Sequence, residues 1–197
     1  AVPGWGSDLA ATLSPDRPQD RAILTYLERA EAKTASAADL TELGVLLAER
    51  GLLEDAEHWL HKAVKADRHL FAARYRLSLV QQRRGKCEDA AKTFARALDE
   101  RPDDAYATFM LALAQERCGH GSDAIADYAR AYHLMPELAI PEKNPLVLDS
   151  KVQVEANLRY NRETVTARTM PIAALDPAAV KAMVAAATAA PPAAAAA

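Results

Sequence analysis

The feature that most constrains this 197-residue chain is a pattern that recurs every 34 residues between Ala37 and Leu138, without insertions. Four kinds of position recur in each copy: a small residue after a leucine, a glycine, an alanine, and one large apolar or aromatic residue. In chain order these positions are Gly44, Gly51, Ala56 and Leu60; Ser78, Gly85, Ala90 and Phe94; Ala112, Gly119, Ala124 and Tyr128. A repeat of this length is one supersecondary unit, and stacked copies bury a continuous core between them. We therefore expect three copies of one unit, stacked in chain order.

Each copy is typical of two helices joined by a short turn. The glycines Gly51, Gly85 and Gly119 can adopt the positive φ that ends one helix and directs the next. Pro102 and Pro136 are expected to end the second helix, because proline lacks an N–H and clashes with the preceding turn. The recurring small residues allow two helices to approach closely. The sequence thus predicts a helical hairpin in each copy.

This pattern resembles the tetratricopeptide repeat (TPR) family, with units at 37–70, 71–104 and 105–138. The chain departs from the family's pattern in the first helix, where the usual early aromatic residue is replaced by Leu40, Arg74 and Thr108. The resemblance implies an all-α fold, an α-solenoid of three TPR helical hairpins.

The segments on either side of the repeats lack the 34-residue pattern. We expect an irregular N-terminal arm at 1–19 and a capping helix at 20–36, with Asp20 as its N-cap. Because Pro141 and Pro145 interrupt any fourth hairpin, residues 139–197 are expected to form an extended, partly irregular C-terminal tail. Within it, the spacing at 146–160 fits either a helix or an extended piece, and a short helix is predicted at 177–190.

Composition and motifs exclude several classes of function. The net charge of −3 and the absence of dense Lys and Arg argue against nucleic acid as a partner. No apolar run reaches the roughly 20 residues that cross a bilayer, so we expect no membrane span, although peripheral association with a membrane complex stays open. His58 and His61 have the spacing of half a metal site, but no HExxH, CxxC or phosphate loop accompanies them. We therefore predict no enzymatic activity, no cofactor and no metal site.

The family resemblance implies a concave groove lined by the first helix of each hairpin, where peptides or helices bind. The groove-facing columns mix apolar, aromatic and arginine side chains: Val45, Tyr75, Arg76, Leu79, Arg83, Tyr106, Phe109, Met110, Leu113 and Arg117. Some members of the family hold a terminal carboxylate with lysine, asparagine and arginine, and the matching positions here lack that set. An apolar or amphipathic protein segment is therefore the expected ligand.

These observations favour a non-enzymatic protein-binding scaffold or accessory subunit, in a larger and possibly envelope-associated complex. One alternative is a carrier of a small apolar ligand or lipid at the aromatic end of the groove. Another is a groove filled by the chain's own arms, through Trp5, Leu146 or Tyr160.

Cys87 and Cys118 are the two cysteines of the chain. In TPR hairpins Cys87 would begin the second helix of the middle unit, and Cys118 would end the first helix of the next. Because successive helices run antiparallel, these ends are neighbours, and a disulfide is expected. With the missing initiator methionine, this favours a periplasmic or otherwise exported protein. The alternative is a cytoplasmic protein with two reduced cysteines that pack as small residues.

Overall fold

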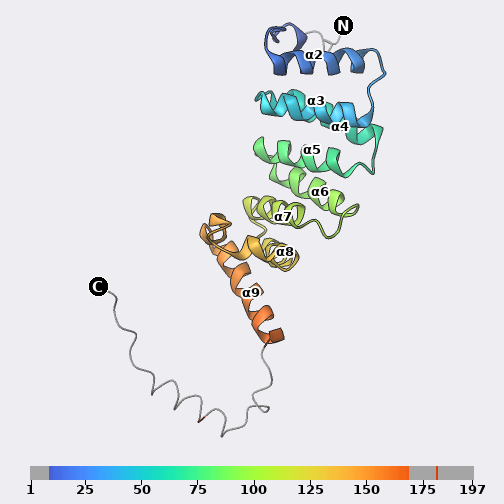
Figure 1. The fold of residues 1–197 in the computed structure, drawn as a ribbon. Helices are drawn as coiled ribbons and strands as arrows, with labels where there is room; N and C mark the ends of the chain where they lie inside the picture. Colours follow the sequence, from blue (N-terminus) through green and yellow to red (C-terminus); the bar gives the residue numbers. More distant parts are fainter. Residues whose placement is uncertain (1–8, 169–180, 182–197) are drawn as a thin grey trace, which may run out of the picture. The chain divides into compact units, whose positions relative to one another are not determined.

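Helices form all the regular structure in the described part of the chain, which is seen in a computed structural model (Figure 1). The structure describes residues 9–168 and Lys181. It divides into a unit that ends at Tyr160 and a second unit that starts at Asn161, and the account below concerns the first. Trp5 and most of the helix predicted at 177–190 lie outside the described residues.

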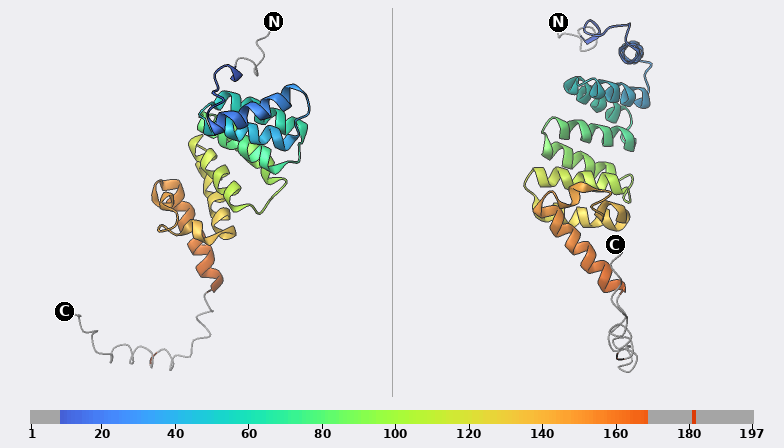
Figure 2. Two further views of the ribbon diagram at one scale, coloured as in Figure 1. Left: turned by 45° about the horizontal axis from the view of Figure 1, so that its top comes forward. Right: turned by 60° about the vertical axis from the view of Figure 1, so that its left-hand side comes forward.

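Three helical hairpins follow one another as the sequence predicted, and the all-α solenoid is confirmed. Their helices are α3 (Ala37–Glu49) and α4 (Leu53–Ala66), α5 (Phe71–Arg83) and α6 (Cys87–Leu98), and α7 (Ala105–Arg117) and α8 (Gly121–Leu134). Each helix contacts the next in chain order, and the two further views in Figure 2 show the same succession. The stack therefore buries a core along its whole length.

The turns and cores of the hairpins follow the repeated positions. The three turn glycines have φ values of +86°, +76° and +85°, which a side chain would strain. Leu60, Phe94 and Tyr128 are fully buried, one in each hairpin. At Gly44 the helices touch, because a Cβ there would lie 2.4 Å from Leu60 Cγ. Small, turn and large positions thus each have the structural role that their spacing predicted.

The helix before the repeats, α2, runs from Pro18 to Glu31. The prediction that Asp20 is its N-cap was wrong: Arg17 holds that position, and proline at the first turn begins the helix. Asp20 is instead buried, and it accepts hydrogen bonds from Ser14 N and Arg50 Nε, both at 3.0 Å. Its role is to tie the N-terminal segment and α2 to the end of α3.

The tail after the third hairpin contains two short 3-10 helices, Pro136–Ala139 and Pro145–Leu148, and then α9 (Lys151–Arg168). The choice that the sequence left open at 146–160 is therefore resolved as helix from Lys151 onward. Val147 and Ala156 are fully buried against the third hairpin, and the ring of Tyr160 lies 6.0 Å from that of Tyr132 on α8. The first part of the tail thus covers the end of the stack.

Candidate protein-binding groove

The first helices of the three hairpins line a cavity of about 410 Å³, which we call the first-helix groove. Of the residues predicted from the sequence, those that line it are Val45, Arg76, Leu79, Arg83, Met110, Leu113 and Arg117. They come from α3, α5 and α7, which are separated in sequence by the second helices. The hairpin repeat is what brings them together.

Two columns of the repeat give the groove its character. Val45, Leu79 and Leu113 lie one repeat apart and form a half-buried apolar row, one residue from each hairpin. Each member of this apolar row is followed four residues later by a charged residue. These charged residues, one from each hairpin, are Glu49, Arg83 and Arg117. Because residues four apart share one face of a helix, the two rows run side by side.

The charge of the groove is mainly positive, and part of it has no partner among the residues that the structure describes. Arg83 Nη1 donates a hydrogen bond to the carbonyl oxygen of Ala48 at 2.9 Å, which links the second hairpin to the first. Arg76 and Arg117 are exposed and have no hydrogen-bond or ion-pair partner among the described residues. Exposed guanidinium groups beside an apolar row suit a segment that has both carboxylate and apolar side chains.

Phe109 was predicted to face the groove, and that prediction was wrong. Its side chain is only 7% exposed, and its ring lies 5.0 Å from Tyr128 and 6.5 Å from Tyr132, in the core of the third hairpin. One residue along a helix turns the side chain by about 100°, so Phe109 faces α8 while Met110 faces the groove. Thr41, in the same column one hairpin earlier than Tyr75, is buried as well.

The two remaining aromatic residues lie outside the lining of the cavity. Tyr75 is half-buried, with its ring 5.6 Å from Phe71 and 5.8 Å from Phe94, and burial raises the pKa of its hydroxyl. Tyr106 is 56% exposed at the start of α7. Tyr75 and Tyr106 lie in the N-terminal halves of α5 and α7 and are not among the residues that line the cavity.

The junction between the first and second hairpins has a buried ionic contact that the sequence analysis missed. Glu57 on α4 is 5% exposed and accepts hydrogen bonds from Arg84 and from Lys86 Nζ, the latter at 2.9 Å. Burial raises the pKa of Glu57, but the hydrogen bonds and charges of Lys86 and Arg84 outweigh it, and the pKa lies below its usual value. The signal available in the sequence was an acidic residue inside an apolar helix face.

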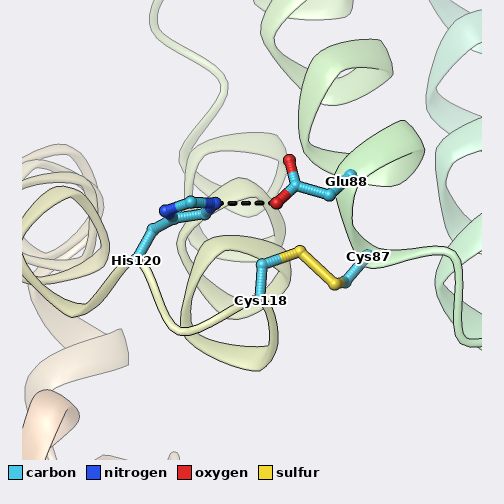
Figure 3. Close-up of a disulfide and its surroundings, with 4 residues drawn as sticks. All are labelled: Cys87, Glu88, Cys118 and His120. Carbon is cyan, nitrogen blue, oxygen red and sulfur yellow. Dashed lines mark hydrogen bonds and ion pairs between the residues drawn. A yellow bond between two sulfur atoms is a disulfide. The ribbon is translucent and has the colours of Figure 1, made fainter.

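At the next junction Cys87 and Cys118 form a disulfide, with their Cα atoms 5.6 Å apart (Figure 3). Beside it, His120 Nε2 lies 2.8 Å from Glu88 Oε1. In the described part of the chain, three side chains of metal-ligand type lie close enough together to hold an ion: Glu88, Cys118 and His120. His58 and His61, the half-site suggested by the sequence, are not in such a group.

Helices long and apolar enough to cross a membrane are absent from residues 9–168. Leu146 and Tyr160, considered as plugs of the groove, do not line it: Leu146 is 44% exposed, and Tyr160 packs against α8. The described part of the tail therefore leaves the cavity lined by the three hairpins alone.

Neither known protein families nor curated proteins match this chain, whereas solved structures do. A structure of MamA is 23% identical, with a TM-score of 0.62 over 75% of this chain and 91% of that chain. YrrB, described as a TPR protein with an unusual peptide-binding site, is 16% identical, with a TM-score of 0.56 over 71% and 66% of the two chains. The first TPR domain of Spaghetti (RPAP3), bound to an HSP90 peptide, is 16% identical, with a TM-score of 0.51 over 66% and 94%. The fold of this chain is therefore of the tetratricopeptide type.

Proposed function

We propose that this chain is a non-enzymatic scaffold or accessory subunit, which holds an amphipathic segment of a partner protein in the first-helix groove. The observation that carries this proposal is the composition of that groove. The apolar row of Val45, Leu79 and Leu113 lies beside two exposed cations, Arg76 and Arg117, that have no partner among the described residues. An amphipathic segment can place apolar side chains on that row and carboxylates beside the two arginines.

Two further observations support a protein ligand. The groove extends across all three hairpins, as a segment of several residues requires. Solved TPR structures that resemble this chain include one bound to a peptide and one described as having a peptide-binding site. A small apolar ligand or a lipid without an acidic group, the other candidate from the sequence, would leave Arg76 and Arg117 without a counter-charge.

The decisive experiment captures the partner at the groove and then measures its affinity. A photoreactive residue at Leu79 should crosslink the partner in its native source, whereas the same residue at the exposed Lys92 on α6 should not. The captured partner, or its crosslinked segment, is then titrated against the wild type and Arg76→Glu/Arg117→Glu. We expect the affinity to fall at least tenfold in that variant, because both cations become repulsive.

A matched control changes the same number of charges on the second helices. Lys65→Glu/Lys92→Glu alters two exposed lysines of α4 and α6, outside the groove, and should bind as the wild type does. Equal losses in the two double variants would mean that only overall charge matters, and the groove would not be the binding site.

We also propose that the protein works in an oxidising compartment, such as the periplasm, within a larger complex of the cell envelope. The disulfide between Cys87 and Cys118 supports this, because such bonds persist outside the reducing cytoplasm. Alkylation of the native protein without reductant, followed by intact mass measurement, tests it. Two alkylated thiols in material taken directly from cells would place the protein in a reducing compartment instead.

A further inference from the structure

The junction between the second and third hairpins gathers four side chains that are all metal ligands in other proteins. Cys87 and Glu88 begin α6, while Cys118 and His120 lie in the turn between α7 and α8 (Figure 3). The ligand atoms of Glu88, Cys118 and His120 all lie within 4.8 Å of one another, and Cys87 is bonded to Cys118. These three side chains supply one sulfur, one imidazole nitrogen and one carboxylate oxygen, and Cys87 is the neighbour that would add a second sulfur.

The geometry suits a tetrahedral ion. Zn²⁺ takes four ligands of these types at about 2.0–2.3 Å, which places the ligand atoms roughly 3.3–3.8 Å apart. The Cα atoms of the two cysteines are 5.6 Å apart, so rotation of the two side chains separates the sulfurs without movement of the helices. His120 and Glu88 already point at each other across 2.8 Å, and binding of an ion between them requires these two atoms to move apart to roughly 3.3 Å.

The disulfide decides whether this donor set is available. A thiolate is the form of cysteine that binds metal, and each sulfur is held in the S–S bond while the disulfide is intact. Reduction by a dithiol adds two electrons and two protons, giving two thiols and the cyclic disulfide of the reductant. Binding of Zn²⁺ then releases the two thiol protons and replaces the hydrogen bond between His120 and Glu88.

We propose that reduction converts this junction into a Zn²⁺ site formed by Cys87, Cys118, His120 and Glu88. In the oxidised protein the disulfide joins the two hairpins, and in the reduced protein the metal joins the same helix ends. The protein thus keeps a crosslink at one position in both redox conditions.

The equivalent place one repeat earlier shows how specific this donor set is. There, Leu53 and Arg84 stand at the positions of the two cysteines, and Lys86 stands at the position of His120. At that junction Arg84 donates a hydrogen bond to Glu54 and Lys86 donates to Glu57, at distances of 2.8–3.0 Å. The two junctions occupy equivalent positions of the repeat, and Glu54 matches Glu88, but only the second junction has the thiols and the imidazole.

Cobalt reports on the proposed ligands directly, because tetrahedral Co²⁺ bound to thiolate has intense visible and near-ultraviolet bands. The full chain is reduced, freed of reductant under anaerobic conditions, and titrated with Co²⁺ and then with Zn²⁺. We expect thiolate-to-cobalt bands that saturate at one ion per chain and disappear when Zn²⁺ displaces the cobalt. The oxidised protein should give no such bands.

Variants test each ligand. Cys87→Ser and Cys118→Ser should each abolish the thiolate bands of the original site or weaken binding at least 100-fold, and His120→Ala should weaken it at least tenfold. His69→Ala is the matched control, since His69 pairs with Glu100 at 2.9 Å elsewhere on the surface and should leave Co²⁺ affinity unchanged. Circular dichroism of every variant confirms that the helices remain. Absence of thiolate bands in the folded, reduced wild type would overturn the proposal, and so would a His120→Ala variant that binds as tightly as the wild type.

Discussion

Lys86 and His120 lie one 34-residue repeat apart, and each contacts a carboxylate of the preceding hairpin. Lys86 Nζ lies 2.9 Å from Glu57 Oε2, and His120 Nε2 lies 2.8 Å from Glu88 Oε1. In each case the turn that follows the first helix of one hairpin contacts the start of the second helix of the preceding hairpin. The repeat therefore specifies where neighbouring hairpins are joined, while the chemistry of the joint differs between the two junctions.

The disulfide should contribute substantially to stability. In the chain-entropy account, closing the loop between Cys87 and Cys118 stabilises the fold by about 3–4 kcal/mol. We expect Cys87→Ser/Cys118→Ser to lower the free energy of unfolding by that amount, measured by urea unfolding with a chelator present. Reductant should lower the stability of the wild type similarly and leave the double variant unchanged. Equal unfolding curves for the oxidised wild type and the variant would show that the crosslink adds nothing.

The first junction should make the protein sensitive to acid. The pKa of Glu57 is lower in the folded state than its usual value of 4.5, so its contribution is present above about pH 4.5. That contribution is lost as the pH falls through the folded pKa, because the carboxylate must take up a proton. We expect Glu57→Gln to cost about 1–2 kcal/mol at pH 7, since it removes hydrogen bonds to charged groups.

The pH profile distinguishes this cause from a general loss of packing. Below pH 4.5 the stability of Glu57→Gln should fall less steeply than that of the wild type, when both are followed by thermal unfolding. Glu155→Gln changes an exposed carboxylate on α9 and is the control, which should keep the wild-type profile. Parallel profiles for wild type and Glu57→Gln would assign the acid sensitivity to other groups.

The hairpins were predictable because the same residue types recur at equivalent positions in all three copies of the repeat. A small residue at Ser78, a glycine at Gly85 and a large residue at Phe94 agree with their counterparts in the other two copies. The register of these copies also brings Cys87 beside Cys118, which no local pattern around either cysteine indicates. Long-range contacts thus followed from the period of the repeat.

Side-chain direction and the tail were less predictable, for physical reasons. Phe109 and Met110 are adjacent apolar residues, and only the packing of α8 decides which of them is buried. Segment 146–160 belongs to no repeat, so its apolar spacing alone did not select helix over strand. Glu57 meets Arg84 and Lys86 from the next hairpin, and nothing near Glu57 in the sequence identifies those partners.

Truncation of Phe109 should lower the stability of the protein much more than truncation of Tyr106, although both residues were predicted to face the groove. Phe109→Ala leaves a cavity between α7 and α8 and should cost about 3–5 kcal/mol. Tyr106→Ala removes an exposed ring and should change stability by less than about 0.5 kcal/mol. Urea unfolding of the two variants checks this. A small effect at Phe109 would mean that its side chain is not part of the core.

The contact at Gly44 predicts that even one methyl group disrupts the first hairpin. An added Cβ would lie 2.4 Å from Leu60 Cγ, and Leu60 is fully buried, so its side chain would have to shift within the core. We expect Gly44→Ala to cost about 1–3 kcal/mol, although alanine favours a helix more than glycine does. Gly121→Ala is the matched control, because its added Cβ would lie at an ordinary 3.7 Å from Val152. A Gly44→Ala variant as stable as Gly121→Ala would contradict the close packing of α3 on α4.

Gln153 should anchor the tail to the third hairpin. It is 3% exposed, and its Nε2 donates to Tyr128 Oη at 3.1 Å, while Tyr128 donates to Glu116 Oε2 at 2.8 Å. Gln153→Ala removes the tail's member of this buried network but leaves the bond between Tyr128 and Glu116 intact. We expect amide hydrogen exchange at 145–160 to become at least fivefold faster, because the loss of one buried hydrogen bond costs about 1 kcal/mol. Exchange in α3 to α6 should stay the same, and Glu155→Ala, an exposed change on the same helix, should leave protection unaltered. Unchanged protection in Gln153→Ala would show that the apolar contacts of Val147 and Ala156 hold the tail without this network.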